Sequence, residues 1–173
     1  TSTPTNKSVS QQKMRNQKQP NEKVRRETSA GAKVYKRTGR GLVFAMVVDG
    51  FGKYTFIKGH VRRDESLVDA AIRETCEETG LCRLKYVAKL GRIDIWFRDR
   101  FVHKGVLVHK YIYYYLFEVP RKARIVIPPP KEKGEQIQRG LWVPEHKVVE
   151  TSSYEDLKPL IEKALKILNE KKK

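Results

Sequence analysis

The stretch that decides the fold runs from Gly59 to Leu81 and reads GHVRRDESLVDAAIRETCEETGL. Between Ser66 and Thr79 it contains neither Pro nor Gly and is rich in Leu, Ala, Arg and Glu, a composition that predicts a helix. Asp64, Glu65 and Ser66 suit the amino-terminal end of this helix. Gly80 suits its C-terminal end, because glycine readily adopts the left-handed conformation found there. We therefore expect one capped helix.

Three carboxylates lie together on this predicted helix. Glu74, Glu77 and Glu78 stand at i, i+3 and i+4, so they project from one edge. Such close like charges repel one another, and the repulsion is relieved by a hard divalent cation such as Mg²⁺, which prefers carboxylate, water and phosphate oxygens. Arg73 lies about two helical turns beyond Glu65, so the two can form an ion pair that orients the ligands. The spacing predicts a magnesium site with a supporting ion pair.

The same stretch resembles the Nudix box, a motif of glycines, glutamates and an arginine at set spacings. The matching positions are Gly59, Glu65, Arg73, Glu74, Glu77, Glu78, Gly80 and the closing apolar Leu81. The one departure is Thr75, where the family usually places an aliphatic residue, and a β-branched Thr can still pack there. Agreement at so many specified positions makes this a specific motif.

The resemblance implies a metal site and a hydrolytic reaction. Arg73 and Glu65 would form the orienting pair. A metal-activated water would attack a diphosphate, and its general base would be Glu78, Glu77 or a glutamate of a late loop, for which Glu135 is the candidate. Mg²⁺ is the implied cofactor, with Mn²⁺ as a substitute. The implied metal ligands are Glu74, Glu77, Glu78 and the carbonyl of Gly59.

The remaining sequence predicts one α/β domain, because strand-like and helix-like segments alternate. A closing helix is expected from Ser152 or Ser153 to about Asn169, with Pro159 acceptable only in its first turn. The expected strands are 32–35, 41–48, 54–58, 83–90, 91–97, 106–119 and 141–143. Together with the resemblance, this order implies a Nudix-type α/β/α sandwich with a mixed central sheet over residues 33–173.

Residues 1–32 are expected to form a flexible basic tail. They hold seven Lys and Arg residues against two Glu, and few large apolar side chains, so they bury too little surface to offset the entropy of ordering. The whole chain carries a formal net charge of +17, which favours an anionic partner, and RNA can bind through the tail. No segment has the length and hydropathy of a membrane span, so no membrane partner is expected. Nothing in the sequence specifies an oligomeric state.

The cysteines indicate a reducing compartment. Cys76 and Cys82 do not make a disulfide framework, and neither stands with His or Cys at zinc spacing. We therefore expect a cytoplasmic protein in which Cys76 is a small packing residue.

The residues that flank the box bear on the substrate. The Lys58-Gly59-His60-Val61 entry and a later Val108-His109-Lys110 resemble the diadenosine polyphosphate hydrolase branch. A chain of several phosphates needs cations to meet its charge. The candidate substrate-binding residues are Lys58, His60, Arg62, Arg63, His109 and Lys110.

Three functions follow from these observations. The first is a Mg²⁺-dependent hydrolase that cleaves the pyrophosphate linkage of nucleoside or dinucleoside polyphosphates. The second is an RNA 5′-pyrophosphohydrolase that uses the same carboxylates. The third is an RNA- or ribosome-associated binding protein that keeps the scaffold without catalysis, against which the intact set of charged box residues argues.

Overall fold

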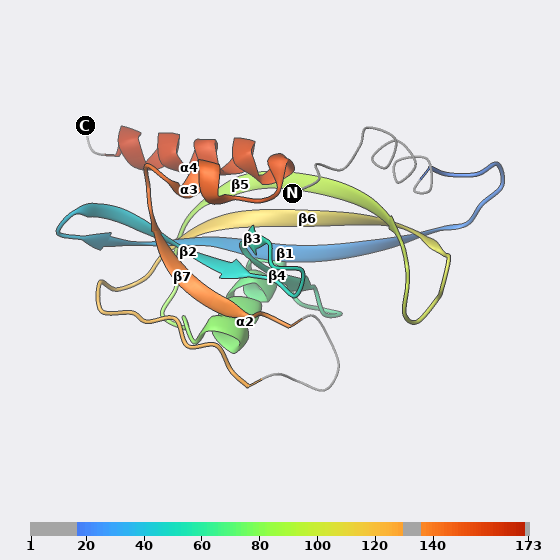
Figure 1. The fold of residues 1–173 in the computed structure, drawn as a ribbon, viewed down its shortest axis with the longest axis horizontal. Coiled ribbons are helices and arrows are strands. Elements are labelled where there is room, and N and C mark those ends of the chain that lie inside the picture. Colours follow the sequence, from blue (N-terminus) through green and yellow to red (C-terminus); the bar gives the residue numbers. More distant parts are fainter. Residues whose placement is uncertain (1–16, 130–135, 172–173) are drawn as a thin grey trace, which may run out of the picture. The chain divides into compact units, whose positions relative to one another are not determined.

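The computed structural model describes residues 17–129 and 136–171. These residues form two compact units. The first contains the described residues up to Thr28 together with Asp94–Tyr111, and the second contains Ser29–Ile93 together with the described residues from Ile112 onward. Figure 1 labels the elements along the chain. They are β1 (Val24–Thr38), β2 (Gly41–Val48), β3 (Tyr54–Thr55), β4 (Ile57–His60), α2 (Leu67–Thr79), β5 (Lys85–Arg98), β6 (Leu107–Glu118), β7 (Arg139–Pro144), α3 (Val148–Thr151), the 3₁₀ turn η1 (Glu155–Leu157) and α4 (Lys158–Glu170).

The strands form one sheet whose main path is β3-β2-β1-β6-β5, with β4 paired to β1 and β7 paired to β2. β1 is long enough to hold two antiparallel partners in succession. Its residues 34–38 pair with β2, and its residues 29–32 pair with β4. This second register places Ala30 opposite Gly59, so the pairing sets the position of the glycine that begins the box.

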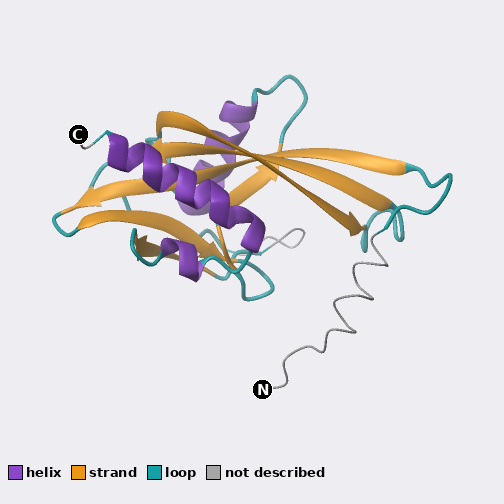
Figure 2. Ribbon diagram, turned by 90° about the horizontal axis from the view of Figure 1, so that it is seen from above, coloured by secondary structure: helices purple, strands orange, loops and turns teal. Residues whose placement is uncertain are grey.

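In the second unit, helices cover both faces of the sheet. α2 and α4 lie on opposite sides of the strands in Figure 1, and the view from above in Figure 2 agrees. Ala70 and Ala71 of α2 pack with Ala30, Ala32 and further apolar residues in one buried cluster. Small side chains at this contact let the helix approach the sheet closely. This is the predicted α/β/α sandwich with a mixed central sheet.

The closing helix α4 presents an apolar stripe to the sheet. Leu160, Ile161, Ala164 and Leu168 are buried at helical spacing. Pro159 lies in the first turn, where a missing backbone N–H breaks no helical hydrogen bond. The end of this helix and its apolar stripe are as expected, but the start predicted at Ser152 or Ser153 is wrong, because α3 and η1 occupy this part of the chain and α4 begins at Lys158.

The first strand begins earlier than predicted. The boundary placed after residue 32 is wrong for residues 24–32, because these residues belong to β1 and Ala30 and Ala32 are buried. Small alanines carry little hydrophobic signal in sequence, yet they can be buried completely under a helix. The predicted tail residues 1–16 lie outside the described residues. The two strands expected at 83–90 and 91–97 are one strand, β5.

Candidate active site

α2 has the predicted caps at both ends. The Ser66 hydroxyl accepts a hydrogen bond of 3.0 Å from the Asp69 backbone N–H. At the other end Gly80 adopts φ 72°, and its N–H donates to the carbonyl of Cys76 at 3.0 Å. The two caps define where the helix begins and ends. Its glutamates therefore keep their positions along one edge.

Gly59 and Glu74 meet so closely that a side chain at position 59 would displace the Glu74 carboxylate. A Cβ added at Gly59 would overlap the carboxyl carbon and both carboxyl oxygens of Glu74. Glu74 is therefore held against the backbone of β4, where a side chain at position 59 would stand. The glutamate on the helix and the glycine on the strand form one site, as the motif predicts.

Arg73 in the middle of α2 is hydrogen-bonded to Glu65, which precedes the start of the helix. Its Nε and Nη2 donate to the two carboxyl oxygens of Glu65 at 2.8 and 2.9 Å, a bidentate pair. Its Nη1 donates to Oε1 of Glu74 at 2.8 Å, and its Nη2 also donates to the backbone carbonyl of His60 at 2.9 Å. The side chains of Arg73, Glu65 and Glu74 are only 14–16% exposed. The predicted ion pair is present and holds Glu74 in place.

The electrostatics of this pair keep both partners charged. Hydrogen bonds from Arg73 lower the pKa of Glu65 from 4.5 to about 2, and the Arg62 backbone N–H contributes in the same direction. The same contacts, with Glu65 first and Glu74 after it, raise the pKa of the Arg73 guanidinium. Neither group can exchange a proton near neutral pH, so the pair serves to position its neighbours.

Glu77 and Glu78 complete the edge of α2. Glu77 is 42% exposed and lies 3.5 Å from Nη1 of Arg73 and 3.7 Å from Nη2 of Arg62. Glu78 follows it on the helix and is half-buried. Both are candidates for a proton-accepting role, because a general base must reach a water near the substrate.

Arginines contact two of the carboxylates that were predicted to bind metal, Glu74 and Glu77. Within the described ranges, no group of three or more His, Cys, Asp or Glu side chains is gathered so that it could hold a metal ion. The donor chemistry nevertheless fits a hard cation. Three carboxylates share one helix edge, and the Glu74 carboxylate lies against the backbone at Gly59. Glu74, Glu77, Glu78 and the Gly59 carbonyl would hold Mg²⁺.

The other predicted substrate-binding residues of this unit lie on β4 and in the segment that leads from β4 to α2. Lys58 lies on β4 opposite Gly31 and is half-buried, whereas His60, Arg62 and Arg63 are exposed. Their role in binding substrate stays a prediction. Glu135, the alternative general base, lies outside the described residues.

His109 and Lys110 belong to the first unit, on β6. The His109 ring stacks on Trp96, with ring centroids 3.9 Å apart, and its Nε2 lies 2.8 Å from Oδ2 of Asp94. Sequence reasoning did not single out Trp96. The signal was present in the alternation of β5, where Asp94 and Trp96 stand two residues apart and therefore share a face.

A disulfide joins Cys76 and Cys82, and the expectation of free cysteines is wrong. Gly80 ends α2 in the left-handed conformation and turns the chain back, which brings the Cα atoms of the two cysteines within 4.4 Å. Cys76 lies between Glu74 and Glu77 along α2, so the bond fastens the turn that carries the carboxylates. The bond is at odds with the predicted cytoplasmic location, since cytosolic reductants keep thiols reduced.

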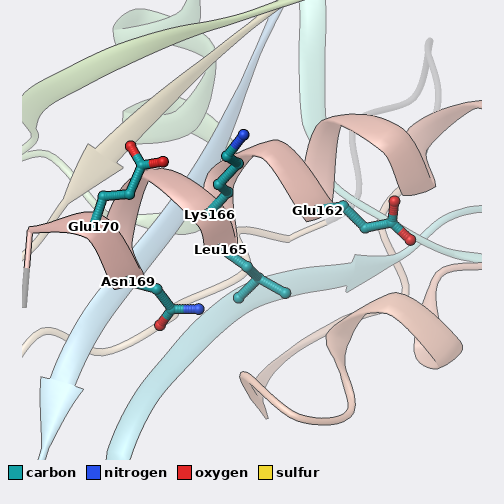
Figure 3. A pocket seen from close by; sticks show the side chains of 5 residues that line it. All are labelled: Glu162, Leu165, Lys166, Asn169 and Glu170. Atoms are coloured by element: carbon teal, nitrogen blue, oxygen red, sulfur yellow. The ribbon is translucent and has the colours of Figure 1, made fainter.

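A shallow pocket lies elsewhere, along the outer side of α4 (Figure 3). It is lined by Glu162, Leu165, Lys166, Asn169 and Glu170, of which only Leu165 is half-buried while the others are exposed. None of them is a predicted site residue, and the hollow offers little enclosure to a ligand.

The fold and the box together define a family. The NUDIX domain matches residues 25–164, and the chain belongs to this family. A protein of Mycobacterium tuberculosis (strain CDC 1551 / Oshkosh) named as a mutator protein, MutT4, is 33% identical over 112 residues, which cover 65% of this chain. The match spans only 41% of the length of that relative.

Solved structures share the architecture. An Ap4A hydrolase of C. elegans in a binary complex superimposes with a TM-score of 0.65 at 19% identity, covering 83% of this chain and 98% of that one. The NUDIX domain of NrtR from Shewanella oneidensis, in complex with ADP ribose, gives 0.61 at 19% identity, covering 90% and 96%. At these identities the likeness establishes the fold.

The described part of the chain contains no helix long and apolar enough to cross a membrane.

Proposed function

We propose that this protein is a Mg²⁺-dependent pyrophosphohydrolase that cleaves the diphosphate linkage of nucleoside or dinucleoside polyphosphates, of the diadenosine polyphosphate type. The observation that carries the proposal is the set of hydrogen bonds that Arg73 donates. They link Glu65 and Glu74 to the backbone of β4. Such an arrangement holds carboxylates rigidly beside a backbone carbonyl, as a site for a hard cation requires.

Each residue of the site has a distinct part in the proposed reaction. Arg73 and Glu65 hold the edge of α2 in register with β4, and Glu74 is pressed against Gly59. Glu78 or Glu77 accepts a proton from the attacking water. When bound, the divalent cation neutralises the diphosphate and lowers the pKa of a water bound to it.

The flanking cations support a polyphosphate substrate. Lys58, Arg62 and Arg63 stand at or shortly before the start of α2 in the same unit as the carboxylates. They provide positive charge for phosphates beyond the scissile pair. The C. elegans neighbour is named an Ap4A hydrolase and the NrtR domain holds ADP ribose, and both ligands contain a diphosphate joined to adenosine.

A product analysis tests this function. The purified protein is incubated with Mg²⁺ and diadenosine polyphosphates, nucleoside triphosphates, ADP-ribose or 5′-triphosphorylated RNA, and the products are identified by mass. The RNA tests the alternative of an RNA 5′-pyrophosphohydrolase, which the net charge of +17 favours. We expect preferential cleavage of the dinucleotides.

Two variants tie the activity to the site. Glu78→Gln and Glu77→Gln are compared, and the one that removes the general base should lower kcat about a hundredfold or more while the fold is kept. Glu162→Gln, on the exposed side of α4, is the matched control and should leave turnover unchanged. Near-normal turnover in both site variants contradicts the assignment.

A further inference from the structure

Three aromatic rings lie in a row in the first unit, of which two are stacked and the third is tilted. Trp96 on β5 and His109 on β6 have centroids 3.9 Å apart and planes 14° apart, so they lie face to face. Tyr111 continues the row on β6, with its ring centroid 4.4 Å from that of His109. Asp94 holds the imidazole through a contact of 2.8 Å to its Nε2. The rings form an ordered row across two neighbouring strands.

The row is accessible at one end. Trp96 is 40% exposed although it is the largest side chain of the row. A Trp on a sheet is usually buried to gain hydrophobic stabilisation, so an indole held in place by stacking and still open to solvent is suited to contact another flat ring.

The charges of the same unit are unbalanced toward the positive. Each carboxylate among the described residues of this unit is engaged by a cationic or imidazole partner: Glu22 by Arg98, Glu27 and Asp99 by Arg25, and Asp94 by His109. Cationic side chains remain on the surface in excess. The exposed ones are Lys18, Lys23, Arg26, Arg100 and Lys104.

An exposed ring held by stacking, together with excess cations, matches one ligand chemistry. Single-stranded nucleic acid presents unstacked bases, which stack on aromatic side chains, and a phosphate backbone, which attracts Lys and Arg. A lipid surface would use the cations and the exposed Phe101 and Val102 at the hairpin tip, but it has no use for flat rings held face to face. A double helix keeps its bases stacked internally.

We propose that the first unit is a binding surface for single-stranded nucleic acid, with Trp96 as the base-stacking residue and the exposed cations of the same unit as phosphate contacts. This binding function is additional to the proposed hydrolase activity, and it does not require that the nucleic acid be cleaved. RNA and DNA share this chemistry, and the experiment distinguishes them by comparing an RNA strand with a DNA strand.

The first experiment measures binding through Trp96 itself. In the full chain, Trp142→Phe leaves Trp96 as the single tryptophan. Addition of a 10-nucleotide oligoadenylate, as RNA or as DNA, should quench its fluorescence, since a stacked base contacts the indole. A duplex of the same length should quench less. Absence of quenching by both single strands overturns the proposal, as does equal quenching by anionic phospholipid vesicles.

Substitutions at position 96 separate stacking from charge. Trp96→Leu keeps an apolar side chain without a flat ring and should weaken binding, measured by fluorescence anisotropy of a labelled oligonucleotide, about tenfold or more. Trp96→Phe should retain most of the affinity. Phe51→Leu, which changes a more exposed ring of the second unit, is the control and should bind normally. Thermal unfolding of each variant verifies the fold. Unchanged affinity in a folded Trp96→Leu protein refutes the assignment.

The salt dependence tests the cations. Each phosphate contact that is lost should reduce the slope of log K against log salt by about 0.7 for a single strand. Arg100→Gln with Lys104→Gln should therefore lower the slope by about 1.4. Arg121→Gln with Lys122→Gln removes two exposed cations of the second unit and should leave the slope nearly unchanged. An equal reduction in both pairs would mean that only overall charge binds the strand, and the localised surface would be rejected.

Discussion

Lys33 carries an amine yet lies in the apolar interior of the protein. It is fully buried on β1, its Nζ has no hydrogen-bond partner, and the Phe56 and Tyr114 ring centroids lie 3.7 and 4.3 Å from that nitrogen. Burial lowers the pKa of this amine well below 10.5. The ring faces compensate only partly for the water that the amine loses on burial.

The buried lysine predicts a pH dependence of stability. Because the pKa of Lys33 is lower in the folded state, the unfolded chain binds more protons between the two pKa values, and the free energy of unfolding rises with pH up to about 10.5. The slope due to one group is at most about 1.4 kcal/mol per pH unit. Lys33→Met should remove this slope and raise stability at neutral pH, as measured by urea unfolding from pH 6 to 9.

An exposed lysine provides the control for this prediction. Lys166→Met should leave the slope as in the parent protein, because Lys166 is exposed on α4. The prediction is contradicted if Lys33→Met is less stable than the parent at neutral pH and its stability depends equally on pH. The buried amine would then be charged, and it would stabilise the fold.

At the scale of the element, α2 combines local signals with one long-range contact. The caps at Ser66 and Gly80 and the spacing of Glu65 and Arg73 depend only on positions along one helix. They could be predicted because the helical repeat converts sequence spacing into spatial spacing. The apposition of Glu74 and Gly59 depends also on the register of β4 against β1, which helical spacing does not specify.

The disulfide at the end of α2 predicts a redox-dependent stability. Cys76 and Cys82 are six residues apart, and closing so short a loop stabilises by about 2 kcal/mol in the chain-entropy treatment. Dithiothreitol should therefore lower the melting temperature of the oxidised protein by about 4–8 °C, as followed by circular dichroism. The double variant Cys76→Ser, Cys82→Ser should melt at the lower temperature with or without the reductant. Two free thiols in the non-reduced protein, counted by mass after alkylation, would contradict the bond.

At the scale of the whole molecule, charge is the dominant feature. A formal net charge of +17 on 173 residues makes the folded chain repel itself, and dissolved salt screens that repulsion. Raising sodium chloride from about 0.05 to about 0.3 M should raise the melting temperature, since the Debye length falls below the spacing of many surface charges.

A charge variant tests the cause of the salt effect. Lys163→Glu with Lys166→Glu, both at exposed positions of α4, changes the net charge by two per substitution, from +17 to +13. The gain in melting temperature with salt should shrink in this variant. A melting temperature that falls with salt in the parent protein would mean that attractive ion pairs, such as those of Arg73, outweigh the net repulsion.

The sequence by itself determined the box helix, its caps, the carboxylate edge, the Arg73–Glu65 pair and the alternation of an α/β domain. All of these follow from spacing within a short segment, where backbone geometry leaves little choice. Only the tertiary structure decided that β1 begins at Val24, that Lys33 is buried between rings, and that Trp96 stacks on His109. These contacts depend on which strands pair and in which register, and burial depends on everything that packs above a residue.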